Sequence, residues 1–245
     1  MMKLAVLVFV LSFVVAAAKN DLATSVGGSH IARWTLPQDV FTGECDLVLV
    51  NAKDFHNGAG LALHVRTTLE PSSSSSSSYM ERAAVRVGEH VLEVLPDKVY
   101  LNGVQYDPSE SEQPLRFTNG NYHYHYKLIK EETKDTRVFR LDLGGWSAIE
   151  FSFYKQFLTV STTGTIHDFG NAVGMLGNYH DGSMWSRSGE PFTQSFEKYA
   201  FEWQVDPRED GQLFRQARAP QLPLEQCRMP SEPKLFQRNL RALRN

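Results

Sequence analysis

The sequence predicts an all-β fold, an antiparallel β-sandwich or barrel-like domain, and two observations carry this prediction. Apolar and polar residues alternate with a period of two over most of residues 85–161, where helical periodicity is almost absent. Asn102-Gly103 stands between two apolar runs, and Asn-Gly indicates a hairpin because it tolerates the positive φ angles of a type I′ turn. Both features are typical of antiparallel sandwiches and barrels.

The same alternation predicts the individual strands. Two extended runs come first, at 46–51 and 61–69, and the turn signal Asn57-Gly58 separates them. The later runs lie at 85–87, 90–95, 98–106, 122–128, 139–143, 149–153 and 158–160.

In residues 122–128, three tyrosines and two histidines fall on opposite faces. Tyr122, Tyr124 and Tyr126 are expected to pack the core rather than to form a sugar-binding stripe. His123 and His125 have a spacing that can chelate Zn²⁺ or Cu²⁺, but no third ligand is apparent in the sequence. We therefore expect them to be ordinary solvent-facing histidines.

Composition excludes several classes of protein. Of the 245 residues, 42% are hydrophobic and 22% charged, which is too apolar for a disordered chain. The net charge of −3 supplies no basic field for nucleic acid, so no nucleic-acid partner is expected. After residue 18, no apolar run approaches the ~18–20 residues of a membrane span. Two cysteines exclude a disulfide-dense scaffold and a multi-cysteine zinc protein.

The first 18 residues have the pattern of a secretory signal peptide. Lys3 gives a short positive region, Leu4–Val15 is apolar apart from Ser12, and three alanines at 16–18 provide a small-residue cleavage site. We expect a secreted, extracellular protein, in a compartment where a disulfide persists.

Three later segments depart from the strand pattern. A Ser-rich stretch at 70–80 is expected to be a flexible loop insertion, because it has no apolar area to bury. Residues 173–192 are dense in Gly, Asn, Asp and Ser, which predicts an irregular surface loop. Residues 206–245 are rich in Pro and Arg, with a possible short amphipathic helix at 235–244.

The sequence contains none of the common catalytic signatures. It has no Gly-x-Ser-x-Gly elbow, no His-Glu-x-x-His motif and no phosphate-cradling Gly loop. We therefore expect a protein that is not an enzyme.

Four motifs in order carry a resemblance to a known family. They are GECDLVLV at 43–50, VYLNGV at 99–104, VGMLGNYHDG at 173–182 and FEWQV at 201–205. Together they resemble a von Willebrand factor type D domain over residues 30–205. The resemblance implies a linker at 19–29, a C-terminal extension at 206–245, and a secreted interaction or structural module. Such a module is adhesive, or associated with matrix or cell wall, and has an extracellular protein or glycan partner.

The sequence also departs from the family pattern. Gly27-Gly28-Ser29-His30 stands where the family usually has Gly-Asp-Pro-His, so the self-cleavage of an Asp–Pro bond known in some members is not expected. Leu176 replaces a cysteine of the late loop. Loss of one family disulfide explains this change and leaves the expected fold intact.

Calcium binding in several type D domains implies an oxygen site in this chain. Asn178 and Asp181 are its remaining candidate ligands, whereas Thr35 stands where the family has a carboxylate. Because Ca²⁺ takes about six to eight oxygens, this set is a degenerate calcium site. The alternative is that Asn178 simply hydrogen-bonds its turn. No other cofactor is expected.

The resemblance also implies a Cys45–Cys227 disulfide. In type D domains the cysteine of the Gly-Glu-Cys motif commonly pairs with a cysteine that follows the Trp-x-Val motif at the end of the domain. In this chain Cys227 lies downstream of Val205, the last residue of that motif. The bond would tie the C-terminal extension to the first strand, in a monomer. The alternative is an intermolecular bridge, which two cysteines also permit.

A second functional hypothesis is a secreted β-sandwich carbohydrate-binding protein or hydrolase with its site in the 173–192 loop. Met184 and Trp185 in a concave pocket with converging carboxylates would favour this hypothesis. A flat surface, with the loop attached to the sheet along its length, would favour the interaction module.

Signal cleavage is the first testable prediction. The secreted protein is expected to begin at Lys19, because the positive, apolar and small-residue regions occur in the order that signal peptidase recognises. N-terminal sequencing or mass spectrometry of the secreted product checks this. A cytosolic product that retains Met1 would contradict it.

Overall fold

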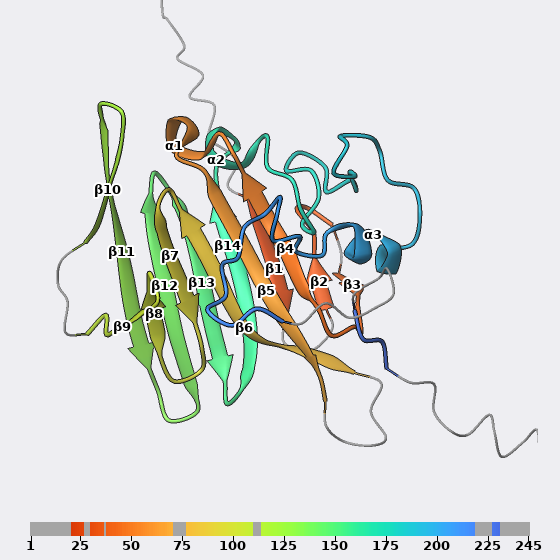
Figure 1. Cartoon of the computed structure of the whole chain (residues 1–245), viewed down its shortest axis with the longest axis horizontal. Coiled ribbons are helices and arrows are strands. Elements are labelled where there is room, and N and C mark those ends of the chain that lie inside the picture. The colour runs from red at the N-terminus through yellow and green to blue at the C-terminus, as the bar shows by residue number, and fades with distance from the viewer. Residues whose placement is uncertain are drawn as a thin grey trace, which may run out of the picture.

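The computed structural model describes residues 21–26, 30–36, 38–70, 77–109, 114–218 and 227–230, and it is a two-layer antiparallel β-sandwich. Two sheets lie face to face, with the short helices and irregular segments gathered at one end and one side (Figure 1). The predicted all-β fold is confirmed. The architecture is a sandwich, because in the described residues each sheet is an open series of strands with two edges.

The larger sheet has eight strands in the order β10-β11-β12-β13-β14-β1-β2-β3. In that order the strands are β10 (Leu115–Asn119), β11 (Tyr122–Glu132), β12 (Thr136–Gly144), β13 (Ser147–Tyr154), β14 (Phe157–Gly164), β1 (Asp21–Val26), β2 (His30–Ala32) and β3 (Gln38–Val40). From β10 to β14 each strand pairs with the next by a hairpin, as expected for a meander.

The smaller sheet has six strands in sequence order, β4 to β9. They are β4 (Asp46–Ala52), β5 (Leu61–Leu69), β6 (Ser78–Val87), β7 (His90–Val94), β8 (Val99–Leu101) and β9 (Val104–Tyr106). In the described ranges, three short helices complete the fold: α1 (Phe55–Gly58), α2 (Ile166–Phe169) and α3 (Phe196–Glu202).

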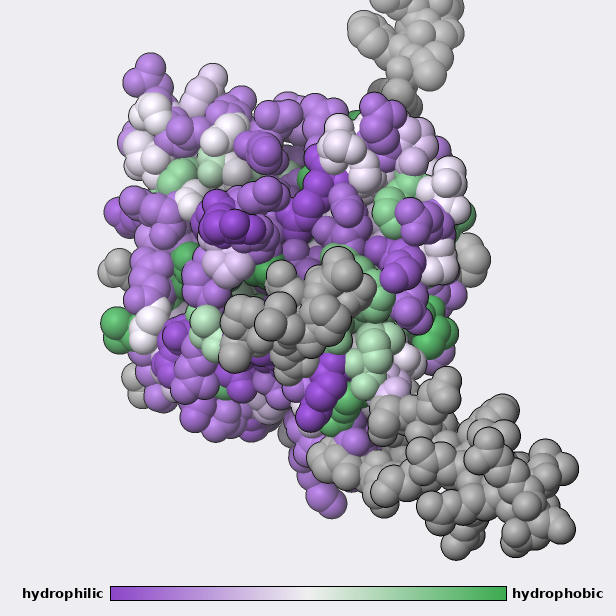
Figure 2. All heavy atoms as spheres, turned by 45° about the vertical axis from the view of Figure 1, so that its right-hand side comes forward, coloured by the Kyte–Doolittle hydropathy of each residue, from purple (hydrophilic) through white to green (hydrophobic). Residues whose placement is uncertain are grey.

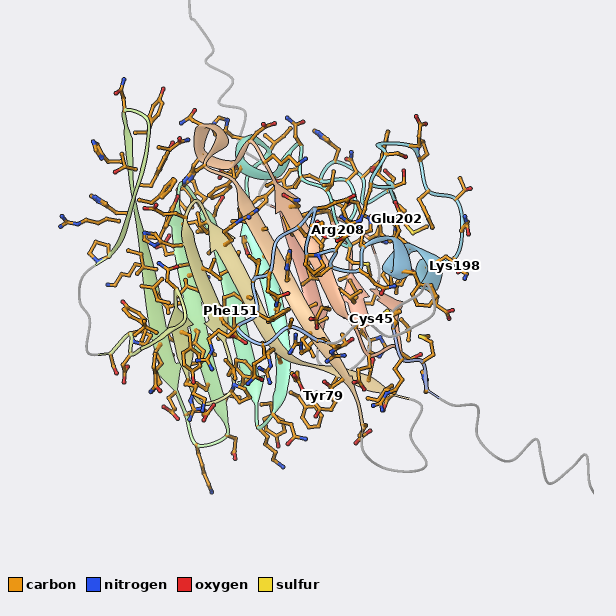
Figure 3. All side chains as sticks on the ribbon, viewed as in Figure 1. Cys45, Tyr79, Phe151, Lys198, Glu202 and Arg208 are labelled. Carbon is orange, nitrogen blue, oxygen red and sulfur yellow. A yellow bond between two sulfur atoms is a disulfide. The ribbon has the colours of Figure 1, made fainter. Side chains whose placement is uncertain are left out.

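The hydrophobic core fills the space between the sheets. Along β13 the burial alternates as the sequence predicts, and Phe151 and Phe153 point inward with Ile149. Figure 3 labels Phe151 within the sandwich. The facing sheet contributes inward residues such as Val65 and Val85. Each fully buried side chain of this kind stabilises the fold by about 1.5–3 kcal/mol, so the paired inner faces are the main source of stability.

The Asn-Gly hairpin prediction is confirmed. β8 ends at Leu101 and β9 begins at Val104, so Asn102 and Gly103 form the two-residue turn. Their φ angles are 49° and 82°, the positive values that a type I′ turn requires.

The N-terminal boundary of the domain differs from the expected one. Residues 21–26, which the sequence analysis assigned to a linker at 19–29, form β1 and pair with β14 and β2 inside the larger sheet. A short strand without strong alternation gives little sequence signal, and pairing with a neighbouring strand decided its structure.

The Ser-rich stretch at 70–80 connects two paired strands. β5 and β6 pair from Leu61 with Val87 to Leu69 with Ser78, so the stretch closes a hairpin within one sheet. Residues 71–76 lie outside the described residues. Because both flanking strands belong to one sheet, the stretch does not separate two domains.

The first part of the C-terminal extension crosses the outer face of the smaller sheet. Residues 206–218 run in front of β5 and β6 in Figure 1, and Leu213 and Phe214 pack on Ala62 and Ala84. We call residues 206–218 the strap. The Arg66 guanidinium donates two hydrogen bonds of 2.7 Å to Asp46 and lies 4.6 Å from the Phe214 ring centroid, which fixes the strap to the sheet.

The predicted Cys45–Cys227 disulfide is present within the chain, and its Cα atoms are 4.9 Å apart. Backbone hydrogen bonds between Glu44 and Arg228 pair the two segments beside it. The bond ties the C-terminal extension to the start of β4, as expected. The predicted signal peptide at 1–18 and the predicted helix at 235–244 lie outside the described residues. Of the helices in the described ranges, none has the length and apolar character needed to cross a membrane.

His64 is fully buried beneath the strap. It lies on the outward face of β5, level with Val48 and Ala84, and is 0% exposed. Neither ring nitrogen finds a hydrogen-bond partner among the described residues. Burial lowers the pKa of His64 to about 4, opposed by the Asp210 carboxylate and assisted by the positive charges of Arg86 and Arg187.

Replacing His64 with leucine is expected to remove part of the protein's sensitivity to acid. Because the folded-state pKa of about 4 lies below the ordinary 6.5, the unfolded chain binds the proton first as the pH falls through this window. His64 therefore lowers the free energy of unfolding between pH 6.5 and 4, by roughly 3 kcal/mol at ~1.4 kcal/mol per pKa unit.

Urea unfolding of wild type and His64→Leu at pH 7 and pH 4 measures this difference. His125→Leu, the same change at an exposed position of β11, is the control and should follow the wild type. A parallel loss of stability in wild type and His64→Leu would show that His64 does not carry the effect.

Candidate functional site

The late loop at 173–192 is anchored to the free edge of β4. β4 pairs with β5 on one side only. On its other side, Asn51 and Val173 exchange backbone hydrogen bonds of 2.7 and 2.9 Å, and Met175 N–H donates to Val48 O at 2.9 Å. The loop is irregular as predicted. The expectation that it lies on the surface is wrong for its first half, because this half covers the sheet edge and is buried.

Gly174 permits this close contact. Its φ is +129°, and a Cβ at this position would lie 2.5 Å from Leu49 O. Any side chain would therefore push the loop away from β4. Beyond it, Met175, Leu176 and Tyr179 are buried in the core, and the Trp34 N–H donates to Leu176 O at 3.0 Å.

The two candidate calcium ligands lie together in a tight turn and are already hydrogen-bonded. Asn178 Oδ1 accepts from the His180 N–H at 2.8 Å. Asp181 Oδ1 accepts from the Ser183 N–H and hydroxyl at 2.9 and 2.7 Å, and these bonds lower the pKa of Asp181. In the parts of the chain that are described, no group of three or more His, Cys, Asp or Glu side chains is arranged to hold a metal ion.

A polar cavity opens at the end of the sandwich where α1 and α2 meet. The two helices lie at the top of Figure 1. We call this space the polar cavity. Its volume is about 220 Å³. Its polar lining consists of Asp54, His167, Asp168, Asn171 and His180. The Asn171 amide donates to Asp54 at 3.1 Å, which fixes both groups at the mouth.

Asp168 is the most buried carboxylate of this cavity, and protein groups surround it. It accepts hydrogen bonds from the Ser147 hydroxyl and, at 3.2 Å, from the Thr165 hydroxyl. His56 Nε2 lies 3.7 Å from its other oxygen. On the far side of the ring, His56 Nδ1 lies 3.0 Å from the Tyr126 hydroxyl. Burial lowers the pKa of His56 and raises that of Tyr126.

The backbone at His56 is held in an uncommon conformation. His56 and Asn57 have φ angles of 45° and 58°, in the left-handed region that few non-glycine residues adopt. The Tyr124 hydroxyl donates to His56 O at 3.0 Å and accepts from the Asn57 amide at 2.7 Å. Asn119 donates to Asn57 O at 2.9 Å. These bonds keep the His56 ring stacked between Phe55 and Tyr124, at 4.0 and 4.5 Å.

Tyr126, His56, Asp168 and Ser147 form a polar chain in which His56 and Asp168 are 3.7 Å apart, and its geometry does not activate Ser147 as a nucleophile. Nucleophilic catalysis by serine needs its hydroxyl bonded to a base such as histidine. The Ser147 hydroxyl instead donates to Asp168, and Ser147 is 1% exposed. The arrangement fixes the position of the Asp168 carboxylate at the cavity wall.

A second cavity lies beside the first, within the late loop. We call it the tryptophan cavity, and its volume is also about 220 Å³. Asn178, Trp185 and Tyr199 line it, together with the segment Gly170–Ala172 that lines the polar cavity as well. The Trp185 indole N–H donates to the Ser183 hydroxyl at 2.9 Å, which orients the ring. The two cavities therefore share one wall.

The tyrosines and histidines of β11 occupy opposite faces, as the alternation predicts. Tyr126 is buried in the core, Tyr124 is half-buried and Tyr122 is exposed, so core packing is confirmed for only part of the row. His123 and His125 are exposed, and His123 Nδ1 lies 3.1 Å from the Thr118 hydroxyl.

One aromatic residue in the turn between β12 and β13 is strongly exposed. Trp146 is 81% exposed and has a φ of +78°, in the turn between β12 and β13. It directly precedes Ser147, which bonds Asp168 in the cavity wall. A bulky residue with positive φ is strained, and such positions cluster at functional sites.

Sequence analysis identified the late loop but missed most of the polar cavity. Asp54 is more than 100 residues from His167 and Asp168 in the sequence, and these residues belong to no common motif. The one signal noted near this end of the fold was Asn57-Gly58, which was interpreted as a turn. Both Trp185 and Asn178 were recognised as part of a candidate binding loop, and they line the tryptophan cavity.

We expect millimolar Ca²⁺ to change the melting temperature little. Asp181 is the main charged candidate ligand, and its carboxylate already accepts two hydrogen bonds from Ser183. Ca²⁺ needs about six to eight oxygen ligands, which this turn does not supply. Thermal melts of wild type and Asp181→Ala with Ca²⁺ or with chelator check this. A large rise in the wild type that Asp181→Ala abolishes would show a working calcium site.

Comparison with known proteins leaves the chain without a family assignment. No known family model matches the chain. No curated protein matches it. Its function is therefore inferred from its own residues and their geometry.

Proposed function

We propose that this protein is a secreted, non-catalytic interaction module of the von Willebrand type D kind, which binds a partner in an adhesive, matrix or cell-wall setting. The observation that carries the proposal is the anchoring of the late loop to β4. A loop held by backbone hydrogen bonds along a sheet edge presents its exposed side chains in fixed positions, which suits recognition.

The positions of the family-like motifs support the same proposal. Residues 43–50, 173–182 and 201–205 are far apart in sequence, yet all three lie along β4. Val48 N–H donates to Trp203 O, and Val205 N–H donates to Asp46 O, both at 2.9 Å. Three of the four motifs that prompted the resemblance therefore form one structural unit, whereas the fourth, at 99–104, lies in β8 and β9 at the other edge of the smaller sheet.

Secretion is supported by the N-terminal signal pattern and by the disulfide. Cys45 and Cys227 are 182 residues apart and paired within the chain. Disulfides persist in oxidising compartments, which agrees with export.

The absence of catalysis is proposed from how the polar groups are used. Asp168 accepts from Ser147 and Thr165, and Asp54 accepts from Asn171. Carboxylates held in this way suit the orientation of a ligand. The second hypothesis, a carbohydrate-binding protein with its site in the 173–192 loop, is favoured by one observation, the position of Trp185 in the wall of a cavity. The hydrolase version of this hypothesis is not supported, because no side chain in the 173–192 loop is held as an activated nucleophile or base.

The proposal is tested with the full chain expressed through a secretory pathway. Labelled protein is incubated with a washed, cell-free extracellular matrix or cell-wall fraction. We expect saturable retention that unlabelled protein competes, with no soluble product released over time. Retention without saturation, or recovery of the protein only inside cells, would contradict an extracellular interaction module.

An enzyme is distinguished by turnover. If soluble products accumulate beyond the amount of protein added, and Asp168→Asn stops their release, the protein is a hydrolase and the non-catalytic assignment is wrong. Equal release by wild type and Asp168→Asn points to a contaminating activity, which a second purification removes before the assay is repeated.

A further inference from the structure

We infer that the polar cavity and the tryptophan cavity together bind two consecutive units of a neutral oligosaccharide, an inference that rests on the proposed extracellular binding function. The two cavities share Gly170, Asn171 and Ala172, so they lie next to each other on either side of this segment. A chain of repeated units matches two neighbouring cavities of equal volume.

The size of the cavities favours small repeated groups. Each has a volume of about 220 Å³. Each alone is smaller than the ~300–1,000 Å³ of typical ligand pockets, whereas the pair falls within that range. One ring-sized unit in each cavity is the simplest occupancy.

The charge of the lining favours a neutral ligand. Within the described chain, no Asp, Glu, Lys, Arg or His lines the tryptophan cavity. In the polar cavity, two aspartates stand with two histidines, and Asp168 is already compensated by two hydroxyl donors. An anionic ligand would therefore meet two carboxylates in the polar cavity, and a ligand of either charge would meet no opposite charge in the tryptophan cavity.

The chemistry of the side chains favours a sugar in particular. A pyranose has hydroxyl groups around its rim and an apolar C–H face. Trp185 lines the tryptophan cavity, and the hydrogen bond from its indole N–H to Ser183 fixes the orientation of its aromatic ring. The one side-chain hydrogen bond of Asn178 in the described residues uses Oδ1, so its amide N–H groups remain for a ligand hydroxyl.

The polar cavity adds the groups that pair with neighbouring hydroxyls. Asp54 and Asn171 are bonded to each other at the mouth and present a carboxylate and an amide side by side. His167 and His180 complete the lining, and each ring has a nitrogen that donates or accepts. Such planar groups bind vicinal diols through pairs of hydrogen bonds.

Titration calorimetry of the full chain with neutral glucose-, xylose-, mannose- and N-acetylglucosamine-based oligosaccharides tests the inference. We expect at least one series to bind, with affinity rising at least tenfold from the monosaccharide to the disaccharide and little beyond it. Failure of every series would overturn the inference. So would equal affinity for monosaccharide and disaccharide, because that result assigns only one subsite.

Variants locate the binding site. Trp185→Leu keeps an apolar side chain but removes the aromatic face, and Asn171→Ala alters the exposed wall that both cavities share. Each is expected to weaken disaccharide binding at least tenfold. Tyr154→Ala removes an aromatic residue that is 53% exposed on the β13–β14 turn, away from the cavities, and should bind as the wild type. Melting temperatures establish that each variant is folded, and unchanged binding by folded Trp185→Leu and Asn171→Ala would overturn the assignment.

The matrix-retention assay separates this inference from the proposed function. Periodate oxidation of the matrix destroys vicinal diols, so the inference expects retention to be lost after this treatment. Retention that survives periodate and resists competition by every oligosaccharide would leave an interaction module with a protein partner, and would overturn the glycan inference alone. Cleavage of a bound oligosaccharide would support the glycan site and contradict the non-catalytic assignment.

Discussion

The second edge of β4, which pairs with no strand of the sheet, is the constraint on which the rest of the molecule depends. An open strand edge presents unpaired backbone groups, and buried backbone groups without partners cost free energy. Three segments form backbone hydrogen bonds along this edge. They are the late loop at Val173–Leu176, the segment Trp203–Val205, and Arg228 beside the disulfide. Because each segment is irregular, the edge strand acts as the template that gives them a fixed path.

The same template explains the strap and the disulfide. The Val205 N–H donates a hydrogen bond to Asp46 O at the start of β4. After this contact, the strap crosses the outer face of the smaller sheet. Arg187 joins the late loop to the strap through two hydrogen bonds of 2.9 Å to Asp210. Figure 2 shows that the uncovered part of one face is mostly hydrophilic, with apolar residues in separate patches. Figure 3 places Lys198 and Glu202 on α3, beside the late loop.

The candidate site follows from this anchoring. Gly174 brings the loop against Leu49, and the buried Tyr199 hydroxyl donates to Gly174 O at 2.6 Å. The loop then has no freedom to collapse into the space beside α2, and two cavities remain there. Their walls are rigid because the Asp54 carboxylate, the Asp168 carboxylate and the Trp185 ring are each held by hydrogen bonds. Rigid walls lower the entropic cost of binding, which is why the site suits recognition.

By itself, the sequence determined the features that depend on local chemistry. Alternation in β11 to β14 and the Asn102-Gly103 turn predicted strands and a hairpin, because side-chain direction and positive φ are properties of near neighbours. The pairing of Cys45 with Cys227 was accessible from the family resemblance. Only the tertiary structure decided that residues 21–26 join the larger sheet and that His56 meets Asp168. Those outcomes rest on the packing of segments more than 100 residues apart, for which no local pattern exists.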